Sequence, residues 1–376
     1  MPARCRVLVL NERDPEHPSA GGAEVHVAEI FGRLAERGFE VTLAAVGFPG
    51  APARDEVRGM RVWRLGGLAQ YYPRVLWTCA NETWQGRFDL VVEHLNKVPF
   101  CSALYSAAPV LAINHHLFGR SAFQQVAWPI AATVVSIEKL IPLVYRNVPI
   151  VAVSQSSKDD LIARGLPPDR IRLIHNGIHF PELEPMPWAE RPCRVAYLGR
   201  LEPYKRVDLM LRALASLTER FPKLEIVLVG RGSARPGLEA LTGELGLASR
   251  TRFAGFVSDA ERDALVREAR VCVCPSVKEG WGITVIEASA LGVPVVATDA
   301  PGLRDAVRHG ETGVLVEDGP SEAFVRRLAS TTEELLRDPS LAARLAQGGR
   351  KWSRRFDWDS AAALMAEALE DARRRP

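Results

Sequence analysis

The sequence lacks a strong net charge and long runs of charge of one sign. Its 376 residues contain 48 Lys and Arg against 45 Asp and Glu, which leaves a net charge of +3. A nucleic-acid-binding protein usually carries a basic block, and the nearest approach is a short arginine tail at residues 373–375. Nucleic acid is therefore not expected as a partner. Hydrophobic residues at 47% and charged residues at 25% exclude a disordered or collagen-like chain and are typical of a globular protein.

Cysteine is scarce and scattered. The six cysteines form no CxxC motif and no Cys/His spacing that suits zinc. Most of them lie in apolar segments, as buried reduced thiols do. The N-terminus has a short apolar strand but no signal-peptide core. We therefore expect a reducing, cytoplasmic compartment and no metal site.

One long segment has almost no charge. Residues 98–137 contain a single charged side chain, Arg120, and the first 22 of them contain none. This length raises the question of a membrane-spanning helix. Prolines and the polar triplet Asn-His-His at residues 114–116 interrupt the segment, so a simple span is rejected. We expect a buried strand, followed by a core helix or by one wall of a binding site.

Short apolar runs alternate with helical patterns along the whole chain. Several runs are almost wholly apolar, as strands buried on both faces are. The predicted strands are residues 6–10, 40–46, 60–65, 90–93, 110–113, 150–154, 171–174, 194–198, 225–229, 251–253, 271–274, 295–298 and 313–316. Helical spacing of apolar residues predicts helices over residues 24–37, 207–219 and 283–291. This alternation indicates an α/β fold with parallel sheets.

A stretch rich in proline and glutamate, residues 181–192, separates the two series of strands. Its composition is typical of a linker. We therefore expect two doubly wound α/β domains, residues 1–185 and 186–358. Ligands bind at the carboxyl ends of the strands in such sheets, so the domains are expected to face each other across a ligand-binding cleft.

The segment from Lys278 to Glu287 has the clearest chemistry. A predicted strand leads into a glycine-rich turn and then into a helix. The free N–H groups of the turn and the helix dipole suit a diphosphate, and Gly280 and Gly282 let the backbone approach the ligand. Glu279 and Glu287 lie about two helical turns apart. Both carboxylates can accept hydrogen bonds from sugar or ribose hydroxyls.

This segment resembles the signature of the retaining glycosyltransferases of family 4, which have the GT-B fold of two Rossmann-like domains. The resemblance covers nearly the whole chain. Its motifs, in matching order, are Gly21-Gly22-Ala-Glu24, His115, Asn176-Gly177, Gly199-Arg200 to Lys205, and E-G-x-G-x-x-x-x-E at residues 279–287. It implies transfer of a sugar from a nucleoside-diphosphate sugar to an acceptor hydroxyl. Residues 1–185 would form the acceptor-side domain, residues 186–358 would bind the donor, and a helix at about residues 359–376 would pack back onto the first domain.

The resemblance implies four catalytic residues. Arg200 and Lys205 would clamp the donor diphosphate, whose charge grows as it leaves. Glu279 would contact the transferring sugar, and His115 would touch the sugar or a phosphate oxygen near the reacting carbon. Because a cationic clamp can replace a divalent metal, we expect no metal ion and no other cofactor.

The other site candidates bind the donor, most of them through the backbone. They are Gly21, Gly22, Val257, Gly280, Trp281, Gly282, Ile283, Thr284 and Glu287. The resemblance implies that Glu287 holds the ribose hydroxyls and that the glycine-rich turn holds phosphate and sugar oxygens. Gly21 and Gly22 would close on the phosphates, and Val257 would line the base.

Four positions depart from the family pattern. Trp281 and Ile283 stand where Phe and Leu are common, and both keep the bulk of the side chain. Arg206 replaces the usual glycine after Lys205 and is expected to add a cation near the phosphates or to point to solvent. His179 stands where an aspartate often follows the Asn-Gly pair. None of these changes removes an expected catalytic group.

Several questions stay open at the level of sequence. A sugar-nucleotide epimerase and a phosphorylase share the architecture, and a non-catalytic nucleotide-sugar-binding protein would bind the donor without turnover. The sugar, the choice of UDP or GDP, and the oligomeric state are undecided. The acceptor could be a glycan, a lipid-linked sugar or a natural product.

An aromatic and apolar segment at residues 71–77 bears on the acceptor. Together with other apolar residues it forms either ordinary core or an apolar acceptor groove. These residues are Phe100, Tyr105, Leu117, Phe118, Phe123 and Trp128. A groove would imply a lipid-linked or apolar acceptor and a peripheral contact with a membrane.

Overall fold

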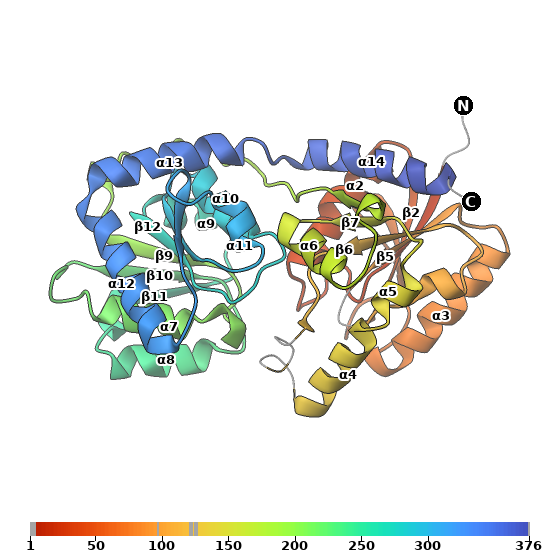
Figure 1. Cartoon of the computed structure of the whole chain (residues 1–376), viewed down its shortest axis with the longest axis horizontal. Coiled ribbons are helices and arrows are strands. Elements are labelled where there is room, and N and C mark those ends of the chain that lie inside the picture. Colours follow the sequence, from red (N-terminus) through yellow and green to blue (C-terminus); the bar gives the residue numbers. More distant parts are fainter. Residues whose placement is uncertain (1–4, 96–97, 120–122, 124–126, 375–376) are drawn as a thin grey trace. The chain divides into compact units, whose positions relative to one another are not determined.

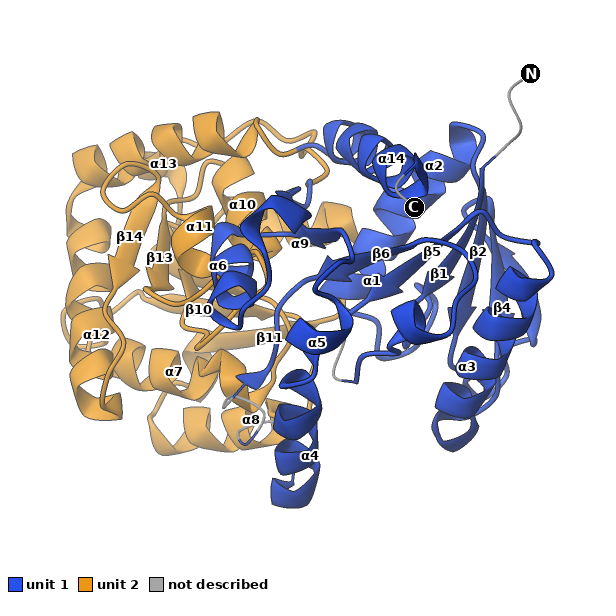
Figure 2. Cartoon of the chain, turned by 45° about the vertical axis from the view of Figure 1, so that its right-hand side comes forward, with its two compact units in different colours: residues 1–177, 357–376 blue, residues 178–356 orange. Residues whose placement is uncertain are grey.

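The computed structural model describes residues 5–95, 98–119, 123 and 127–374 (Figure 1). Arg120 and Arg375, which were considered above, lie outside these residues. The chain divides into unit 1, residues 1–177 and 357–376, and unit 2, residues 178–356 (Figure 2). The first boundary thus falls at 177/178 instead of the expected 185/186. Residues 178–185, which were expected in the first domain, belong to unit 2.

Within the described residues, unit 1 has an eight-stranded sheet of order β3-β4-β2-β1-β5-β6-β7-β8. Its strands are β1 (Arg6–Leu10), β2 (Glu40–Ala45), β3 (Arg54–Val57), β4 (Met60–Arg64), β5 (Leu90–His94), β6 (Val110–Asn114), β7 (Ile150–Ala152) and β8 (Ile171–Leu173). All neighbouring pairs are parallel except β3 with β4. The edge strand β3 was not expected, because its four residues contain three charged ones and form no apolar run.

Helices cover both faces of this sheet, because its central strands are apolar on both sides. In β1, Val7 and Val9 enter one core, whereas Leu8 and Leu10 enter the other. The helical elements of unit 1 are α1 (Gly22–His26), the π-helix η1 (Val27–Phe31), α2 (Gly32–Glu36), α3 (Leu68–Trp84), η2 (Ser102–Leu104), α4 (Trp128–Glu138), α5 (Ile141–Val144), α6 (Gln155–Ala163), η4 (Pro168–Arg170) and α14 (Trp358–Arg374). The helix expected over residues 24–37 is thus interrupted by a π-helical turn.

The chain returns to unit 1 at its C-terminal end. Helix α14 begins at Trp358 and packs on η1 and α2, and also on strands β5 and β6 (Figure 2). Trp358, Met365 and Leu369 are buried in the same core as Val27 and Phe31. The core of unit 1 is therefore completed by residues that follow the whole of unit 2 in the sequence.

Unit 2 has a six-stranded parallel sheet of order β11-β10-β9-β12-β13-β14 in the described part of the chain. Its strands are β9 (Arg194–Leu198), β10 (Glu225–Val229), β11 (Thr251–Gly255), β12 (Val271–Cys274), β13 (Val295–Thr298) and β14 (Gly313–Val316). Its helices are η5 (Trp188–Glu190), η6 (Pro203–Lys205), α7 (Val207–Ala215), α8 (Arg235–Glu244), η7 (Ala248–Arg250), α9 (Asp259–Arg267), α10 (Ile283–Ala290), α11 (Leu303–Ala306), α12 (Ser321–Arg337) and α13 (Pro339–Ser353). Cys272 and Cys274 are buried in β12 as free thiols, as expected.

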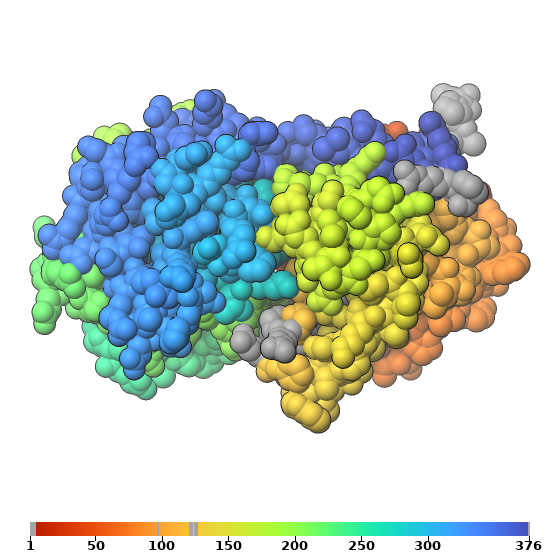
Figure 3. All heavy atoms as spheres, viewed as in Figure 1, coloured from red at the N-terminus to blue at the C-terminus, as the bar shows by residue number. Residues whose placement is uncertain are grey.

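The charge-poor segment forms the buried strand β6 and the more exposed helix α4. No helix among the described residues is long and apolar enough to cross a membrane. The aromatic set around residues 71–77 divides between core and surface: Tyr71 and Phe100 are buried, whereas Trp77 is 65% exposed. Figure 3 shows helices α4 and α5, in yellow, at the surface of unit 1.

Trp358 offers a test of how far unit 1 depends on its C-terminal helix. The side chain is 2% exposed, so Trp358→Ala is expected to lower the free energy of unfolding by about 3–5 kcal/mol. Trp84→Ala is the matched control, because Trp84 is 77% exposed and its loss should change stability by about 0.5 kcal/mol or less. Urea denaturation followed by circular dichroism measures both. Equal effects of the two substitutions would contradict the packing described here.

Candidate active site

The site residues of unit 2 follow strands that lie next to one another. Strand β9 pairs with both β10 and β12, and β10 pairs with β11, all in parallel. Gly199 and Arg200 follow β9, Val257 follows β11, and the glycine-rich turn follows β12. Because the carboxyl ends of parallel strands share one edge of the sheet, these segments meet there.

Lys205 and Glu279 form an ion pair at this edge. The Lys205 Nζ contacts Glu279 Oε1, and the two side chains are only 11% and 15% exposed. Burial disfavours the charged ammonium, but Glu279, together with Tyr204 and Cys274, more than offsets burial, so the pKa of Lys205 is raised. The pair joins the turn after β9 to the turn after β12. It brings together two of the residues that the sequence predicted to be catalytic.

Tyr204 contacts both predicted cations, Arg200 and Lys205. Arg200 Nη2 donates a hydrogen bond of 2.8 Å to the Tyr204 hydroxyl, and Lys205 Nζ lies 5.1 Å from the centre of the Tyr204 ring. The backbone carbonyl of Tyr204 accepts a hydrogen bond of 3.2 Å from Val277 N–H. Burial disfavours the Arg200 charge, yet Tyr204 and the acids Glu202 and Glu279 raise the Arg200 pKa. Arg200 and Lys205 are thus held on one short turn.

The glycine-rich turn leads directly into helix α10. Gly282 is the N-cap and has a φ of 82°, in the left-handed region that favours glycine. A Cβ at this position would lie 3.2 Å from Ala306 Cβ. Helix α10 begins at Ile283. The N–H groups of Ile283 and Thr284, in its first turn, have no partner within the helix and suit an anion. Gly280 precedes them in the turn.

Trp281 lies in the same turn, but its side chain points into unit 2. It is buried, and its ring packs edge-on against Phe356 with 4.9 Å between the ring centroids. The indole therefore anchors the turn to the core. Only the backbone of Trp281 can take part in ligand binding, which is the part that the resemblance assigned to it.

Glu287 is the second carboxylate of the motif and lies on α10. Arg262 of α9 contacts it, with 3.4 Å between Arg262 Nη1 and Glu287 Oε1. Burial raises the pKa of Glu287 to about 7; Arg262 opposes this rise, and the acids Asp263 and Asp259 add to it. His179, which stands at the position of the usual aspartate, also lowers the Glu287 pKa. Near neutral pH, Glu287 is therefore divided between its ionised and protonated forms.

The expectation for Arg206 was wrong. Its guanidinium neither faces the Lys205–Glu279 pair nor lies free in solvent. It donates to the Pro275 carbonyl at 2.8 Å and to Asp318 at 2.7 Å, and its Cζ lies 4.4 Å from the centre of the Phe324 ring. Arg206 is the N-cap of α7, and its backbone has a φ of 52°, in the left-handed region. Its side chain points toward Pro275, Asp318 and Phe324.

In unit 1, Gly21 and Gly22 begin helix α1. Glu24 Oε2 accepts a hydrogen bond of 2.6 Å from Gly21 N–H, which caps the helix start. Burial raises the pKa of Glu24, while this backbone contact lowers it. The amide of Gly21 is thus already engaged, and the start of α1 is fixed by the glutamate of the Gly-Gly-Ala-Glu motif.

His115 follows β6 and belongs to a buried cluster of three histidines. His94 Nδ1 lies 3.1 Å from His115 Nε2, and the two rings stack. The ring of His26, from α1, lies 4.8 Å from His115 and binds Asn176 Oδ1 through Nδ1 at 2.8 Å. Burial lowers the pKa of all three histidines, that of His26 to about 4. The cluster connects His115 with the helix that Gly21 and Gly22 begin.

Sequence patterns missed several residues that hold this site. Each of them contacts a predicted residue: Tyr204 does so within one turn, whereas Arg262, His26 and His94 do so from other segments of the chain. Of the four, only Tyr204 could have been found from the sequence, because it lies beside Lys205 in the predicted motif. Among the described residues, no group of three or more His, Cys, Asp or Glu is arranged to hold a metal ion.

Comparisons with known proteins show the family of the chain. The family described as "Glycosyl transferases group 1" matches residues 183–352, and "Glycosyltransferase Family 4" matches residues 20–180. A D-inositol 3-phosphate glycosyltransferase of Thermobispora bispora is 31% identical, over 95% of this chain and 91% of the relative. A protein of the same name from Streptomyces coelicolor is 28% identical, over 100% and 93% of the two chains.

Solved structures show the same fold at lower identity. Sucrose-phosphate synthase from Thermosynechococcus elongatus has a TM-score of 0.80 at 23% identity, over 98% of this chain and 99% of that chain. HepE from Anabaena, in complex with UDP-glucose, has a TM-score of 0.75 at 21% identity, over 97% and 99%. The chain has the GT-B fold of two α/β units, and the family matches make it a glycosyltransferase. Within that class, the chain belongs to glycosyltransferase family 4.

The contact between Arg262 and Glu287 predicts a shift in ionisation. Removing the cation in Arg262→Gln is expected to raise the Glu287 pKa above about 7, because Arg262 opposes the effect of burial. Carbon NMR of glutamate side chains, assigned with Glu287→Gln, measures the midpoint. Arg252→Gln is the control, since Arg252 contacts Glu261 instead. An unchanged or lower midpoint in Arg262→Gln would contradict the proposed electrostatic role.

Proposed function

We propose that this glycosyltransferase moves a sugar from a nucleoside-diphosphate sugar to an acceptor hydroxyl, with retention of the anomeric configuration and without a metal ion. The observation that carries the proposal is the Lys205–Glu279 pair, which lies beside Arg200 where helix α10 begins. Two cations and the first N–H groups of a helix suit a diphosphate. A carboxylate beside them suits the hydroxyls of the attached sugar.

Donor binding would exchange one charged partner for another. The diphosphate would bind Lys205 and Arg200, and Glu279 would then accept hydrogen bonds from the sugar. Glu287 would accept hydrogen bonds from the ribose hydroxyls, which its ionised form does better. Because the Glu287 pKa is raised to about 7, donor affinity is expected to decline as the pH falls below that value.

The chemical step would separate charge at the donor. The bond from the anomeric carbon to the diphosphate oxygen breaks, and its electron pair stays on the diphosphate. The acceptor oxygen forms its bond on the same face, and its proton passes to the departing phosphate oxygen. Arg200 and Lys205 would stabilise the growing negative charge. Glu279 would accept hydrogen bonds from the sugar hydroxyls, so the proposed front-face route uses no carboxylate nucleophile.

A donor panel gives the most direct test of the proposal. UDP- and GDP-linked sugars would be compared by thermal shift, since a ligand that binds the folded state raises the melting temperature by mass action. The expected result is one nucleotide class that stabilises the protein and is slowly hydrolysed. Conversion of the donor to an epimer without an acceptor would indicate an epimerase. Binding without turnover in the presence of acceptors would indicate a non-catalytic protein.

Lys205→Ala should remove the larger part of the diphosphate clamp. We expect a loss of about 10²–10³ in kcat, measured as hydrolysis or transfer with the best donor. Because Glu279 would lose its partner, Lys205→Arg is made in parallel and should retain more activity. Lys223→Ala, at an exposed position, is the control. With folding verified by circular dichroism, wild-type activity of Lys205→Ala would refute the assignment.

The stereochemistry and the metal requirement are tested together. The product anomer, read from its anomeric proton coupling, is expected to match that of the donor. Activity in excess chelator is expected to equal activity in buffer, because Arg200 and Lys205 supply the positive charge. An inverted product would refute retention, and activity that depends on added Mg²⁺ or Mn²⁺ would refute metal independence.

A further inference from the structure

Helices α4 and α5 of unit 1, with the two residues that join them, expose large apolar side chains to solvent. Four of these side chains, which we call the apolar face, are Trp128, Ile130, Leu140 and Leu143, at 72%, 56%, 49% and 78% exposed. Single exposed apolar residues are common on protein surfaces, but these four all lie between residues 128 and 143. Figure 3 shows this segment, in yellow, at the surface of unit 1.

The apolar face runs along one side of a nearly continuous helix. Lys139 and Leu140, which join α4 to α5, have a right-handed helical backbone, with φ of −66° and −82°. The buried residues of this segment are Ala131, Val134, Glu138 and Ile141. They are three or four positions apart, as residues on one helix face are. Leu140 and Leu143 lie outside that buried face, where a surface helix usually carries polar or charged side chains.

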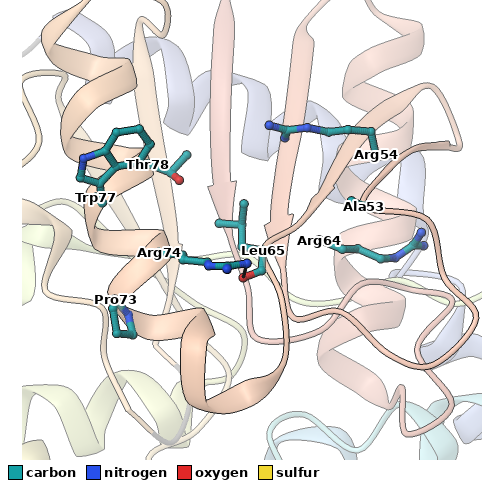
Figure 4. A pocket seen from close by; sticks show the side chains of 8 residues that line it. All are labelled: Ala53, Arg54, Arg64, Leu65, Pro73, Arg74, Trp77 and Thr78. Carbon is teal, nitrogen blue, oxygen red and sulfur yellow. Dashed lines mark hydrogen bonds between the residues drawn. The ribbon is translucent and has the colours of Figure 1, made fainter.

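The exposure of Trp77, on α3, has a different setting. Trp77 is 65% exposed, but it lines a cavity of about 450 Å³ together with Leu65, Pro73 and Arg74 (Figure 4). No residue of α4 or α5 lines this cavity. Figures 1 and 2 both show α4 projecting from unit 1. Small ligands bind in concave sites, so the apolar face suits an extended partner instead.

The one acidic residue of the segment, Glu138, points inward. It ends α4 and is 1% exposed. Its carboxylate accepts hydrogen bonds of 2.6 Å from Phe118 N–H and 2.9 Å from Gly119 N–H, and Arg164 Nη1 lies 3.3 Å away. Glu138 therefore adds no negative charge to the exposed surface. These contacts also attach α4 to the segment that follows His115.

Two cations accompany the apolar face. Lys139 lies between α4 and α5, Arg146 follows α5, and both are exposed. In the part of the chain that the structure describes, neither has a carboxylate within ion-pair distance. Apart from Glu138, residues 127–147 contain no other charged side chain. The exposed surface of this segment therefore combines apolar side chains with positive charge.

A lipid bilayer with anionic headgroups matches this combination. Helices that lie in the interfacial plane pair residues such as Trp and Leu with Lys and Arg, and Trp is enriched at the boundary between water and acyl chains. Anionic lipids attract the cations. A symmetric contact between two copies of the chain would bring Lys139 and Arg146 of both copies to one interface, where like charges repel. The charges therefore favour a bilayer over a second copy.

We propose that α4 and α5 dock unit 1 on the surface of a bilayer that contains anionic lipids. The apolar face enters the headgroup region, and Lys139 and Arg146 contact lipid phosphates. A peripheral membrane contact was expected from an apolar groove around residues 71–77; the proposal assigns it to α4 and α5 instead. It does not depend on the proposed donor chemistry, because no residue of the Lys205–Glu279 site takes part.

Sedimentation of the full chain with vesicles tests this contact. The vesicles contain phosphatidylcholine alone, or phosphatidylcholine with about one third phosphatidylglycerol. We expect the protein to bind the anionic vesicles about tenfold or more tightly than the neutral ones, and to bind them less tightly as the salt concentration rises. Equal binding to both kinds of vesicle, or no binding to anionic vesicles at about 1 mM lipid, would overturn the proposal.

Two double variants assign the binding to this segment. Leu140→Ser with Leu143→Ser removes two exposed apolar side chains, and Lys139→Gln with Arg146→Gln removes both cations. Each double variant is expected to bind anionic vesicles about tenfold or more weakly than the wild type. All four side chains are exposed or nearly half exposed, so folding should be retained, as circular dichroism would verify. Wild-type binding by both double variants would overturn the assignment.

The controls change matching side chains elsewhere in unit 1. Leu364→Ser alters an exposed leucine of α14, which packs on the other face of the sheet from α5. Arg61→Gln with Arg87→Gln removes the same charge, but these cations are paired with Glu40 and Glu82. Both controls are expected to bind vesicles as the wild type does, and an equal loss in the controls would overturn the assignment. Failure of UDP and GDP to bind would refute only the proposed donor.

Discussion

The ion pair between Lys205 and Glu279 is the interaction on which the rest of the donor site depends. Burying two charges carries a desolvation cost that their attraction must offset, and removing one partner of such a pair costs about 3–5 kcal/mol. The pair therefore joins the turns that follow β9 and β12. Arg200 and Tyr204 lie on the first turn, and the start of α10 follows the second. The hydrogen bond from Val277 N–H to the Tyr204 carbonyl joins the same two turns.

At both ends of the glycine-rich segment, a carboxylate lies beside a cation. Glu279, before α10, is balanced by Lys205, and Glu287, on α10, is balanced in part by Arg262. A ligand with a diphosphate at one end and ribose hydroxyls at the other would meet each carboxylate beside a cation. Because Lys205 is already charged and held at this turn, donor binding would need only to replace Glu279 by the diphosphate as its partner.

Sequence patterns predicted those features that depend on local composition. The parallel strands are apolar runs, and the glycine-rich turn has a motif, so both could be located. The strand β3 has charged residues along an edge and gave no such signal. Arg262 and His94 could not be found because they act through contacts with distant segments. Arg206 was misjudged because its side chain binds the Pro275 carbonyl and Asp318, partners that only the folded chain brings near.

The three buried histidines of unit 1 are expected to be uncharged near neutral pH. His26, His94 and His115 are buried against one another, and burial lowers the pKa of each, so protonating any of them near neutral pH is costly. Near neutral pH, His115 is therefore expected to be uncharged. In the proposed transfer, the positive charge that stabilises the leaving diphosphate would come from Arg200 and Lys205 of unit 2.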